Sequence, residues 1–291
     1  MFPPGSAANP MRATRREFLR AAVLGIPLLE MSARASQSIL ELPPPPDGEK
    51  ISYGPGEFQF GELRIPTGAG PHPVAIVIHG GYWRAAYGLK HIGHLCAALT
   101  KAGVATWSLE YRRVGNPGGG WPGTFDDIRD GPSHLRQIAL AKKLDLKRVI
   151  ATGHSAGGHL VLWLARQAPV ELRGVVPLAP VADLRRAYEL QLGNQAVREL
   201  LGGSPKDRPE RYAAASPPDL LPLKVRQRLL HGLADNIVPI SLSQGYVTVA
   251  RAKGDDATLQ ELRGMGHFEL IDPRSAAWPP LRDVVLDLLA L

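Results

Sequence analysis

The 291-residue chain has one cysteine, few aromatic residues and no long apolar run, and each scarcity excludes a class of protein. A single cysteine, Cys96, rules out a disulfide within a monomer, and its apolar neighbours over 95–99 indicate a small buried core residue. The formal net charge is +7, but Lys and Arg are not interleaved with aromatics, so we expect no nucleic-acid partner. No apolar stretch is long enough for a stable membrane span. What is present, 44% hydrophobic and 21% charged residues, is the composition of a globular protein with a substantial core.

The amino terminus carries the pattern of an export signal. Arg15 and Arg16 form a twin arginine ahead of a short apolar stretch over 21–29, and Ala33-Arg34-Ala35 has the A-x-A form of a cleavage site. Paired arginines of this kind are read by the twin-arginine export machinery. We therefore expect residues 1–35 to be a twin-arginine-type signal, a mature chain from about Ser36, and a periplasmic or secreted protein. A buried or disordered amphipathic tail is the alternative, and either Met1 or Met11 is the start.

After the signal, residues 36–54 contain four consecutive prolines and predict a stiff linker. Strand and helix patterns then alternate to the end of the chain. They predict strands at 57–65, 74–79, 104–109, 147–152, 172–179, 225–230 and 258–262, and helices at 88–101, 124–143, 156–166, 242–252 and 281–289. Such alternation predicts one α/β domain over 55–291, with a mostly parallel sheet and helices on both faces. Thr124 to Asp127 has the form of a capping box, and the composition of 183–221 predicts a small helical cap.

Residues 153–157 read Gly-His-Ser-Ala-Gly, the G-x-S-x-G turn that lifts a nucleophilic serine above the edge of a sheet. A predicted strand precedes this turn and a predicted helix follows it, which is the context the motif requires. A side chain at Gly153 or Gly157 would collide with the neighbouring backbone in so tight a turn. The alternative is a chance match in a chain with 31 glycines, and the strand and helix favour Ser155 as a nucleophile.

A serine hydroxyl needs a base to take its proton, and the base needs a carboxylate to orient it. After a serine of this kind, the carboxylate and then the base follow later strands of the sheet. Asp235 comes directly after strand 225–230, and His267 comes directly after strand 258–262. A turn or helix cap is the alternative role for Asp235. The positional rivals are Asp183, Asp255 and Asp256 for the carboxylate and His231 for the base.

The loop after strand 74–79 is the second part of the predicted site. An oxyanion needs backbone N–H donors in a dry environment. We expect one donor from Ala156 and another from Gly80-Gly81, where glycine lets the backbone approach a substrate closely. An ordinary glycine turn is the alternative. Tyr82 and Trp83 either line the substrate pocket or pack the loop; with the small cap, we place them in the pocket and expect a short acyl group.

The remaining polar residues are assigned structural roles. We expect His79 to orient the oxyanion loop and His154 and His159 to make structural hydrogen bonds. Arg112 and Asp127 are a candidate pair beneath the site. His91 and His94 have an i, i+3 spacing but no third ligand nearby, so no metal is expected.

The stretches His79-Gly-Gly-Tyr-Trp83 and Gly153-His-Ser-Ala-Gly-Gly-His159 together resemble the arylformamidase (kynurenine formamidase) branch of the α/β hydrolases. They also resemble the wider esterase–lipase group related to hormone-sensitive lipase, and the resemblance spans residues 55–291. It implies an α/β-hydrolase fold without a cofactor, with Ser155 as nucleophile, Asp235 as orienting carboxylate, His267 as base, and Gly80, Gly81 and Ala156 around the oxyanion.

We therefore expect a serine hydrolase that cleaves small carboxylic esters. An amidase that hydrolyses an N-formyl amide, such as N-formylkynurenine, is the enzymatic alternative. A non-catalytic binding protein with this fold is the alternative from another class, and a triad with all three positions filled speaks against it.

Overall fold

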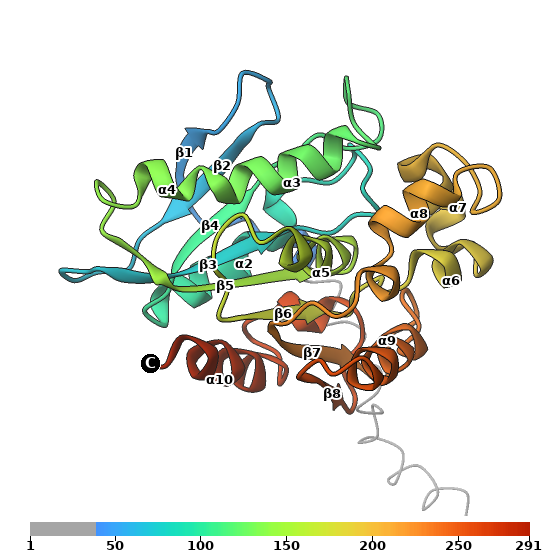
Figure 1. The fold of residues 1–291 in the computed structure, drawn as a ribbon. Coiled ribbons are helices and arrows are strands. Elements are labelled where there is room, and N and C mark those ends of the chain that lie inside the picture. The colour runs from blue at the N-terminus through green and yellow to red at the C-terminus, as the bar shows by residue number, and fades with distance from the viewer. Residues whose placement is uncertain (1–38) are drawn as a thin grey trace, which may run out of the picture.

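The computed structural model describes residues 39–291, and the expected export signal lies outside the described residues. The strands are β1 (Glu49–Ser52), β2 (Phe60–Arg64), β3 (His72–Ile78), β4 (Ala105–Leu109), β5 (Leu144–His154), β6 (Gly174–Leu178), β7 (Arg226–Gly232) and β8 (Ala257–Leu262). They form one sheet in the order β1-β2-β4-β3-β5-β6-β7-β8 (Figure 1). β2 pairs antiparallel with β1 and with β4, and the other neighbours are parallel. The mostly parallel sheet predicted from the sequence is confirmed.

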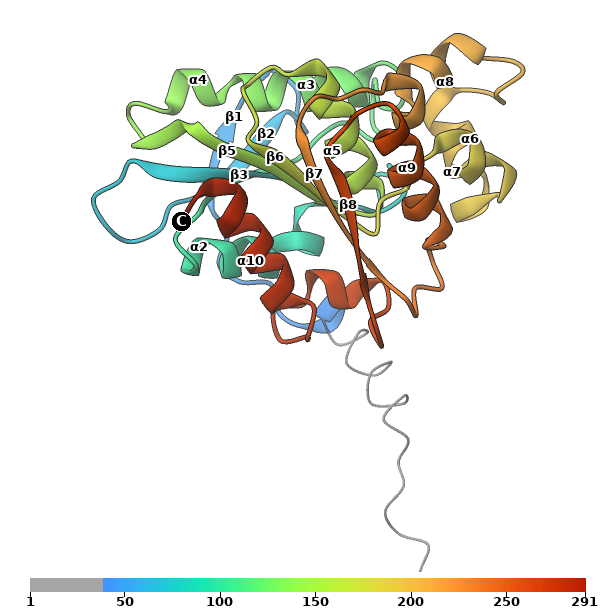
Figure 2. The same cartoon turned by 60° about the horizontal axis from the view of Figure 1, so that its bottom comes forward.

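Helices cover both faces of this sheet. Figure 2 shows α2 (Gly93–Lys101) and α10 (Trp278–Leu289) on one side, and α3 (Gly123–Ser133), α4 (Leu135–Ile138), α5 (Ala156–Gln167) and α9 (Ser241–Ala252) on the other. Each side has its own apolar core, one containing Cys96 and Val285 and the other containing Trp107 and Tyr246. Because β3 is covered on both faces, its residues are buried from end to end, which explains its continuous apolar run.

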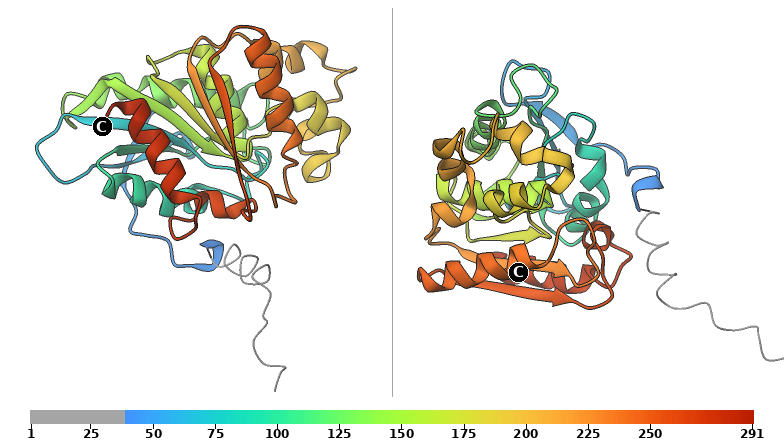
Figure 3. Two further views of the ribbon diagram at one scale, coloured as in Figure 1. Left: turned by 90° about the horizontal axis from the view of Figure 1, so that it is seen from below. Right: turned by 90° about the vertical axis from the view of Figure 1, so that its right-hand side faces the viewer.

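The connection between β6 and β7 is the small helical cap. It contains α6 (Leu184–Glu189), α7 (Leu192–Leu201), α8 (Pro209–Ala215) and the 3-10 turn η2 (Pro217–Leu220). These helices lie together at one end of the sheet, beside α9 (Figures 1 and 3). Asp183 begins α6, where its carboxylate accepts the N–H groups of Arg185 and Arg186 at 2.9 and 3.1 Å. This candidate carboxylate is therefore a helix cap.

The sheet begins inside the segment that the sequence predicts as a linker. β1 pairs with β2 from Glu49–Leu63 to Ser52–Phe60, so the linker over 36–54 and the domain start at 55 are wrong. β1 is a four-residue edge strand with the sequence Glu-Lys-Ile-Ser, which shows neither a β-branched run nor a clear alternation. Its strand conformation comes from its partner rather than from its own pattern.

The helix predicted over 124–143 is also wrong in extent. α3 ends at Ser133, one residue after Pro132, and a separate short helix, α4, follows. Proline lacks the N–H of a helical residue and disfavours helical continuation. The capping box is wrong as well, because α3 begins at Gly123 with no side-chain cap. Thr124 Oγ1 instead donates to the carbonyl oxygen of Arg112 at 2.5 Å, so a tertiary contact uses the group that was expected to cap.

Candidate active site

Ser155 lies in a sharp turn between β5 and α5. Its backbone is left-handed in φ (φ 59°, ψ −118°), and the residue is 3% exposed. A Cβ at Gly153 would lie 2.5 Å from the carbonyl oxygen of Gly157, and a Cβ at Gly157 would collide with the carbonyl oxygen of Ile78. Both glycines are thus required sterically, as predicted. The turn thus holds a strained backbone at the serine that the sequence predicts as the nucleophile.

Asp235 and His267 are 32 residues apart in the chain and are in contact in the structure. Asp235 follows β7, His267 precedes the 3-10 turn η3 (Phe268–Ile271), and Oδ2 of the aspartate is 2.6 Å from Nδ1 of the histidine. The carboxylate accepts this hydrogen bond, so Nδ1 carries the proton. In the neutral ring, Nε2 then has a free lone pair and is the basic atom.

The Asp235 carboxylate is fully buried but richly hydrogen-bonded. Oδ1 accepts the backbone N–H groups of Ile237 and Val238, each at 2.9 Å, and Nε2 of His231 lies 3.3 Å from Oδ2. Burial raises the pKa of this carboxyl group, but hydrogen bonds from His231 and His267 outweigh burial and leave the pKa well below its ordinary value. Asp235 is therefore ionised at neutral pH. His231, the rival base, is a supporting residue of the carboxylate.

Ser155 and His267 line one cavity of about 680 Å³. No hydrogen bond joins the Ser155 hydroxyl to the imidazole among residues 39–291, and such bonds commonly tighten only when substrate binds. The volume is in the range that accepts a drug-sized molecule. Much of the wall is apolar, with contributions from Leu40, Phe60, Tyr82, Tyr87, Leu89, Ile237 and Phe268.

The glycine loop after β3 reaches the serine. A Cβ at Gly80 would lie 2.7 Å from the carbonyl oxygen of His154 and 3.1 Å from Cβ of Ser155, so the backbone passes directly beside Ser155. Gly81 lines the cavity, and within the described chain its N–H donates to no acceptor. Ala156 is the first residue of α5, where helical N–H groups have no intrahelical partner. Unused N–H donors thus lie on two sides of Ser155.

His79 holds this loop in place, as predicted. Its Nδ1 donates to the carbonyl oxygen of Gly80 at 2.8 Å, and its Nε2 lies 3.1 Å from Oε1 of Glu110. The ring also stacks on Tyr111 with centroids 4.5 Å apart. Burial raises the pKa of Glu110, but the contacts with His79 and Arg113 lower it by more than burial raises it. The pKa is therefore below its ordinary value, and the carboxyl group stays ionised.

Tyr82 and Trp83 point to different places. Tyr82 lines the cavity, whereas Trp83 is fully buried and packs edge-on against His159 with ring centroids 5.2 Å apart. The assignment of Trp83 to the substrate pocket is therefore wrong, and the alternative that it packs the loop is correct. Both residues have positive φ, 53° and 56°, a backbone path that a sequence pattern does not reveal. With Trp83 in the core and a cavity of this volume, the argument for a short acyl group loses its basis.

Two further histidines hold the candidate base, His267, a role that no pattern in the sequence indicates. Nε2 of His154 lies 2.9 Å from the carbonyl oxygen of His267, and Nδ1 of His154 lies 3.0 Å from Nε2 of His91. A carbonyl only accepts, so His154 donates from Nε2 and accepts the Nε2–H of His91 at Nδ1. Burial lowers the pKa of His91 to about 3 and that of His154 well below its usual value, so both rings are neutral.

No sequence signal links His91 to His154, because they are 63 residues apart and the spacing of His91 draws attention to His94 instead.

The other rivals have structural roles. His159 donates from Nε2 to the carbonyl oxygen of Ala215 at 3.0 Å. Asp255 accepts the N–H groups of Leu223 and Lys224, and Asp256 pairs with Arg228.

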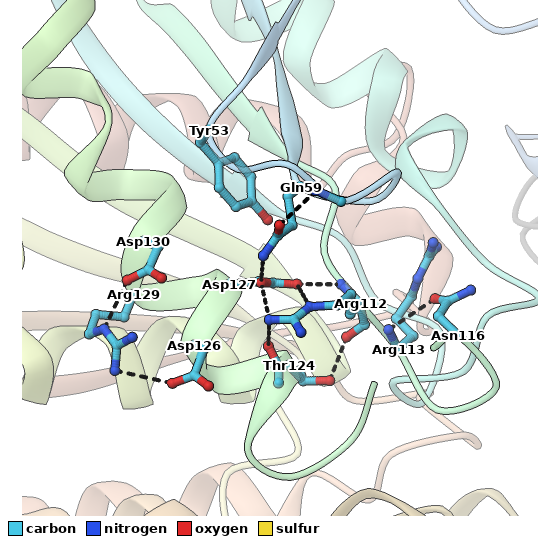
Figure 4. Close-up of polar contacts among 12 residues, drawn as sticks. Tyr53, Gln59, Arg112, Arg113, Asn116, Thr124, Asp126, Asp127, Arg129 and Asp130 are labelled. Atoms are coloured by element: carbon cyan, nitrogen blue, oxygen red, sulfur yellow. Dashed lines mark hydrogen bonds and ion pairs between the residues drawn. The ribbon is translucent and has the colours of Figure 1, made fainter. Parts of the chain in front are cut away.

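The predicted pair of Arg112 and Asp127 is present and belongs to a larger network (Figure 4). Arg112 donates from Nε and Nη2 to the two carboxylate oxygens of Asp127 at 2.8 and 2.7 Å, and Gln59 donates to the same carboxylate at 2.7 Å. Tyr53 donates from its hydroxyl to the carbonyl oxygen of Glu110 at 2.7 Å. The network joins the β1–β2 hairpin, the end of β4 and α3, and so fixes the wall of the cavity that carries Glu110.

Relatives in sequence include hydrolases from distant organisms. A protein of Oryza sativa subsp. japonica named "Probable isoprenylcysteine alpha-carbonyl methylesterase ICME" is 25% identical over 263 residues, which cover 82% of this chain and 63% of that protein. The chain thus spans less than two thirds of the rice protein. Kynurenine formamidase of Salmo salar is 25% identical over 237 residues, which cover 76% of this chain and 75% of the salmon protein.

Solved structures share the fold at low identity. Esterase B from Lactobacillus rhamnosis has a TM-score of 0.73 and 19% identity, covering 90% of this chain and 91% of its own. A truncated carbohydrate esterase from gut microbiota has a TM-score of 0.73 and 20% identity, covering 85% of this chain and 98% of its own. These likenesses confirm the α/β-hydrolase fold. The BD-FAE family model matches residues 63–248, well over half of the chain. The chain therefore belongs to the BD-FAE family of α/β-hydrolase-like proteins.

Proposed function

We propose that the chain is a serine hydrolase that cleaves small carboxylic esters through an acyl-enzyme on Ser155. The observation that carries the proposal is the ordered contact from Asp235 to His267, at 2.6 Å, beside a serine in a strained turn that lines the same cavity. Membership of the BD-FAE family and the methylesterase relative support hydrolysis of esters.

In the acylation step, Ser155 Oγ attacks the ester carbonyl carbon while Nε2 of His267 takes the hydroxyl proton. The negative charge moves to the carbonyl oxygen, where the N–H groups of Ala156 and Gly81 stabilise it. Loss of one such donor costs about two to three orders of magnitude in rate. The imidazolium, stabilised by ionised Asp235, then protonates the leaving alcohol as the C–O bond breaks.

Deacylation repeats these steps with water as the nucleophile. His267 takes a proton from water, hydroxide adds to the acyl carbonyl, and the same N–H groups stabilise the second oxyanion. Collapse of this intermediate breaks the bond to Ser155, and His267 returns the proton to Oγ. The carboxylic acid leaves, and the free enzyme is restored.

Hydrolysis of an N-formyl amide is the second candidate, and the kynurenine formamidase relative is the observation that favours it. The same residues would serve, with an aryl amine as the leaving group in place of an alcohol. Parallel assays with p-nitrophenyl acetate and N-formylkynurenine separate the two candidates. A value of kcat/KM at least tenfold higher for one substrate assigns the chain to that class.

The central experiment compares Ser155→Ala with Ser241→Ala. Ser241 is an exposed serine at the start of α9 and does not line the cavity. Wild type and Ser241→Ala should hydrolyse p-nitrophenyl acetate and react with a fluorophosphonate, whereas Ser155→Ala should do neither. A folded wild-type protein that neither hydrolyses the ester nor reacts with the probe is a binding protein, and the hydrolase proposal fails.

Export is the other part of the proposal, and it is supported by the twin arginine and the A-x-A site in the sequence. The full chain is expected to meet the twin-arginine machinery and to reach the periplasm or the medium. Replacing Arg15 and Arg16 by lysine should leave precursor in the cytoplasm, while Arg12→Lys, outside the pair, should be exported normally. If cell fractionation shows that the double variant is exported as well as wild type, the proposal of twin-arginine export fails.

A further inference from the structure

The described chain begins with a segment that reaches the catalytic cavity. We call residues 39–48 the proline strap, because they contain the four consecutive prolines. Leu40 and Asp47 of the strap line the same cavity as Ser155 and His267. In Figure 2 this blue start of the chain lies on the same side of the sheet as α2 and α10. A segment that reads as a linker in the sequence is therefore part of the candidate active site.

The strap is fixed to the body of the protein at several points. Ile39 is 4% exposed, and Pro45 packs at the start of α2, where a Cβ at Gly93 would lie 3.4 Å from the proline ring. Arg64 donates to the carbonyl oxygen of Pro46 at 3.2 Å, and the N–H of Gly48 donates to Glu62 at 3.3 Å. Each proline has a restricted φ, so little backbone entropy is lost when the strap is held. The strap therefore has the properties of a stiff wall.

The carboxylates along this wall differ in whether they have an ion-pair partner. Glu62 pairs with Arg64 at 3.1 Å, and Glu110 pairs with Arg113 at 3.0 Å. Asp47, in contrast, has neither an ion pair nor a hydrogen bond to any residue in the described range. Its carboxylate lines the cavity and is exposed to solvent. A group of the substrate that approaches Asp47 meets a negative charge that has no ion-pair partner among the described residues, and Lys90 is the one lysine that lines the same cavity.

We infer that the proline strap selects the substrates of this enzyme. Leu40 limits the size of the substrate group that extends from the carbonyl toward the strap, and Asp47 favours a neutral or cationic end of that group over an anionic one. The inference rests on the proposed hydrolase function. It adds that a segment outside the family match, which begins at residue 63, determines which esters are accepted.

The size effect is tested with Leu40→Trp, and Glu41→Trp is the matched control. Glu41 is an exposed neighbour that does not line the cavity. Two substrate series are used, p-nitrophenyl esters from acetate to decanoate and acetate esters from ethyl to decyl, because the strap bounds either the acyl or the alcohol side. In one series, Leu40→Trp should lower the ratio of kcat/KM for the longest to the shortest ester at least fivefold. Glu41→Trp should stay within twofold of wild type.

The charge effect is tested with Asp47→Asn, and Glu41→Gln is the control because it removes the same charge from the same segment. On the acyl side, mono-p-nitrophenyl succinate is compared with p-nitrophenyl butyrate. On the alcohol side, acetylcholine is compared with 3,3-dimethylbutyl acetate. Asp47→Asn should raise the relative kcat/KM of the anionic ester, or lower that of the cationic one, about threefold. The effect should shrink as salt screens the charge.

The outcomes separate this inference from the function beneath it. Active variants whose size and charge ratios all stay within twofold of wild type would overturn the role of the strap and leave the hydrolase intact. A control that shifts the ratios as much as Leu40→Trp and Asp47→Asn do would also overturn it. A wild-type protein that hydrolyses no ester in either series would remove the hydrolase, and the inference with it.

Discussion

Asp235 shows how one buried side chain is committed to a single role. Its two oxygens accept two backbone N–H groups and the Nδ1–H of His267, and Nε2 of His231 lies 3.3 Å from Oδ2. Every contact comes from a donor, so the pocket fits a carboxylate and not an amide of the same shape. In the proposed mechanism, this charge stabilises the imidazolium that forms when His267 takes the serine proton.

Asp235→Asn tests this role. The amide NH2 cannot accept from His267, so the imidazole loses its orientation and the stabilisation of its charged form. We expect kcat for p-nitrophenyl acetate to fall on the order of 10³–10⁴-fold. Asp183→Asn is the control, because Asp183 also accepts two backbone N–H groups but contacts no histidine, and its kcat should stay within twofold. Steady-state kinetics in which kcat of Asp235→Asn stays within tenfold of wild type would contradict the assignment of Asp235 as the orienting carboxylate.

At the scale of elements, the Arg112–Asp127 network explains how the sheet edge and α3 are joined. Asp127 is fully buried, while the Arg112 side chain is 26% exposed, so the pair spans the boundary between core and solvent. Gln59, from the turn between β1 and β2, donates to the same carboxylate. Leu63 joins the hairpin to the apolar core, and this polar contact adds to its attachment.

Asp127→Asn should destabilise the fold by about 3 kcal/mol, because the buried negative charge is lost and an NH2 group faces two donors in place of one carboxylate oxygen. Asp126→Asn is the matched control one residue earlier, where an exposed carboxylate pairs with Arg129 at 3.1 Å. Its cost should stay below about 1 kcal/mol. Urea unfolding followed by circular dichroism measures both. Equal losses in the two variants would show that burial of the network does not contribute to stability.

The same elements show which features a sequence can predict. The turn at Ser155 is predictable because its glycines are required by contacts within five residues and with the adjacent strand. The order of Asp235 and His267 is predictable because both follow parallel strands that end at one edge. β1, the start of α3 and the position of Trp83 are not predictable in this way, because partners distant in sequence decide them. The proline strap belongs to this second group, since its contacts with Gly93 and Arg64 give it a role that its composition does not indicate.

At the scale of the whole molecule, stability depends on two apolar cores with no disulfide among the described residues, where the one cysteine is buried and free. Over residues 39–291, no helix has the length and hydropathy of a membrane span. His154 and His159 are fully buried, His91 is half-buried beside the cavity, and all three rings are neutral: burial lowers the pKa of His91 to about 3, that of His159 to about 4, and that of His154 well below 6.5. The unfolded chain binds protons at these positions at a higher pH than the folded chain does.

These histidines should make the protein sensitive to mild acid. Because the folded pKa values are depressed below the unfolded value of 6.5, the unfolded state binds more protons once the pH falls below it, and stability declines toward the folded pKa values near 4 and 3. Each ring contributes up to about 1.4 kcal/mol per pH unit in this window. Depressed carboxyl pKa values, such as that of Asp235, add to the loss only below about pH 4.

His159→Gln is the variant that isolates one of these contributions, because His159 packs in the core away from the catalytic contacts. The substitution can lower the unfolding free energy at pH 7 by any amount. Between pH 6 and 4.5, however, the slope of the unfolding free energy against pH should be smaller than that of wild type by about 1.4 kcal/mol per pH unit. His134→Gln, at a half-buried position, is the control for the substitution itself. Urea denaturation at half-unit pH steps gives the three slopes. A slope for His159→Gln equal to that of wild type would contradict the neutral state assigned to this ring in the folded protein.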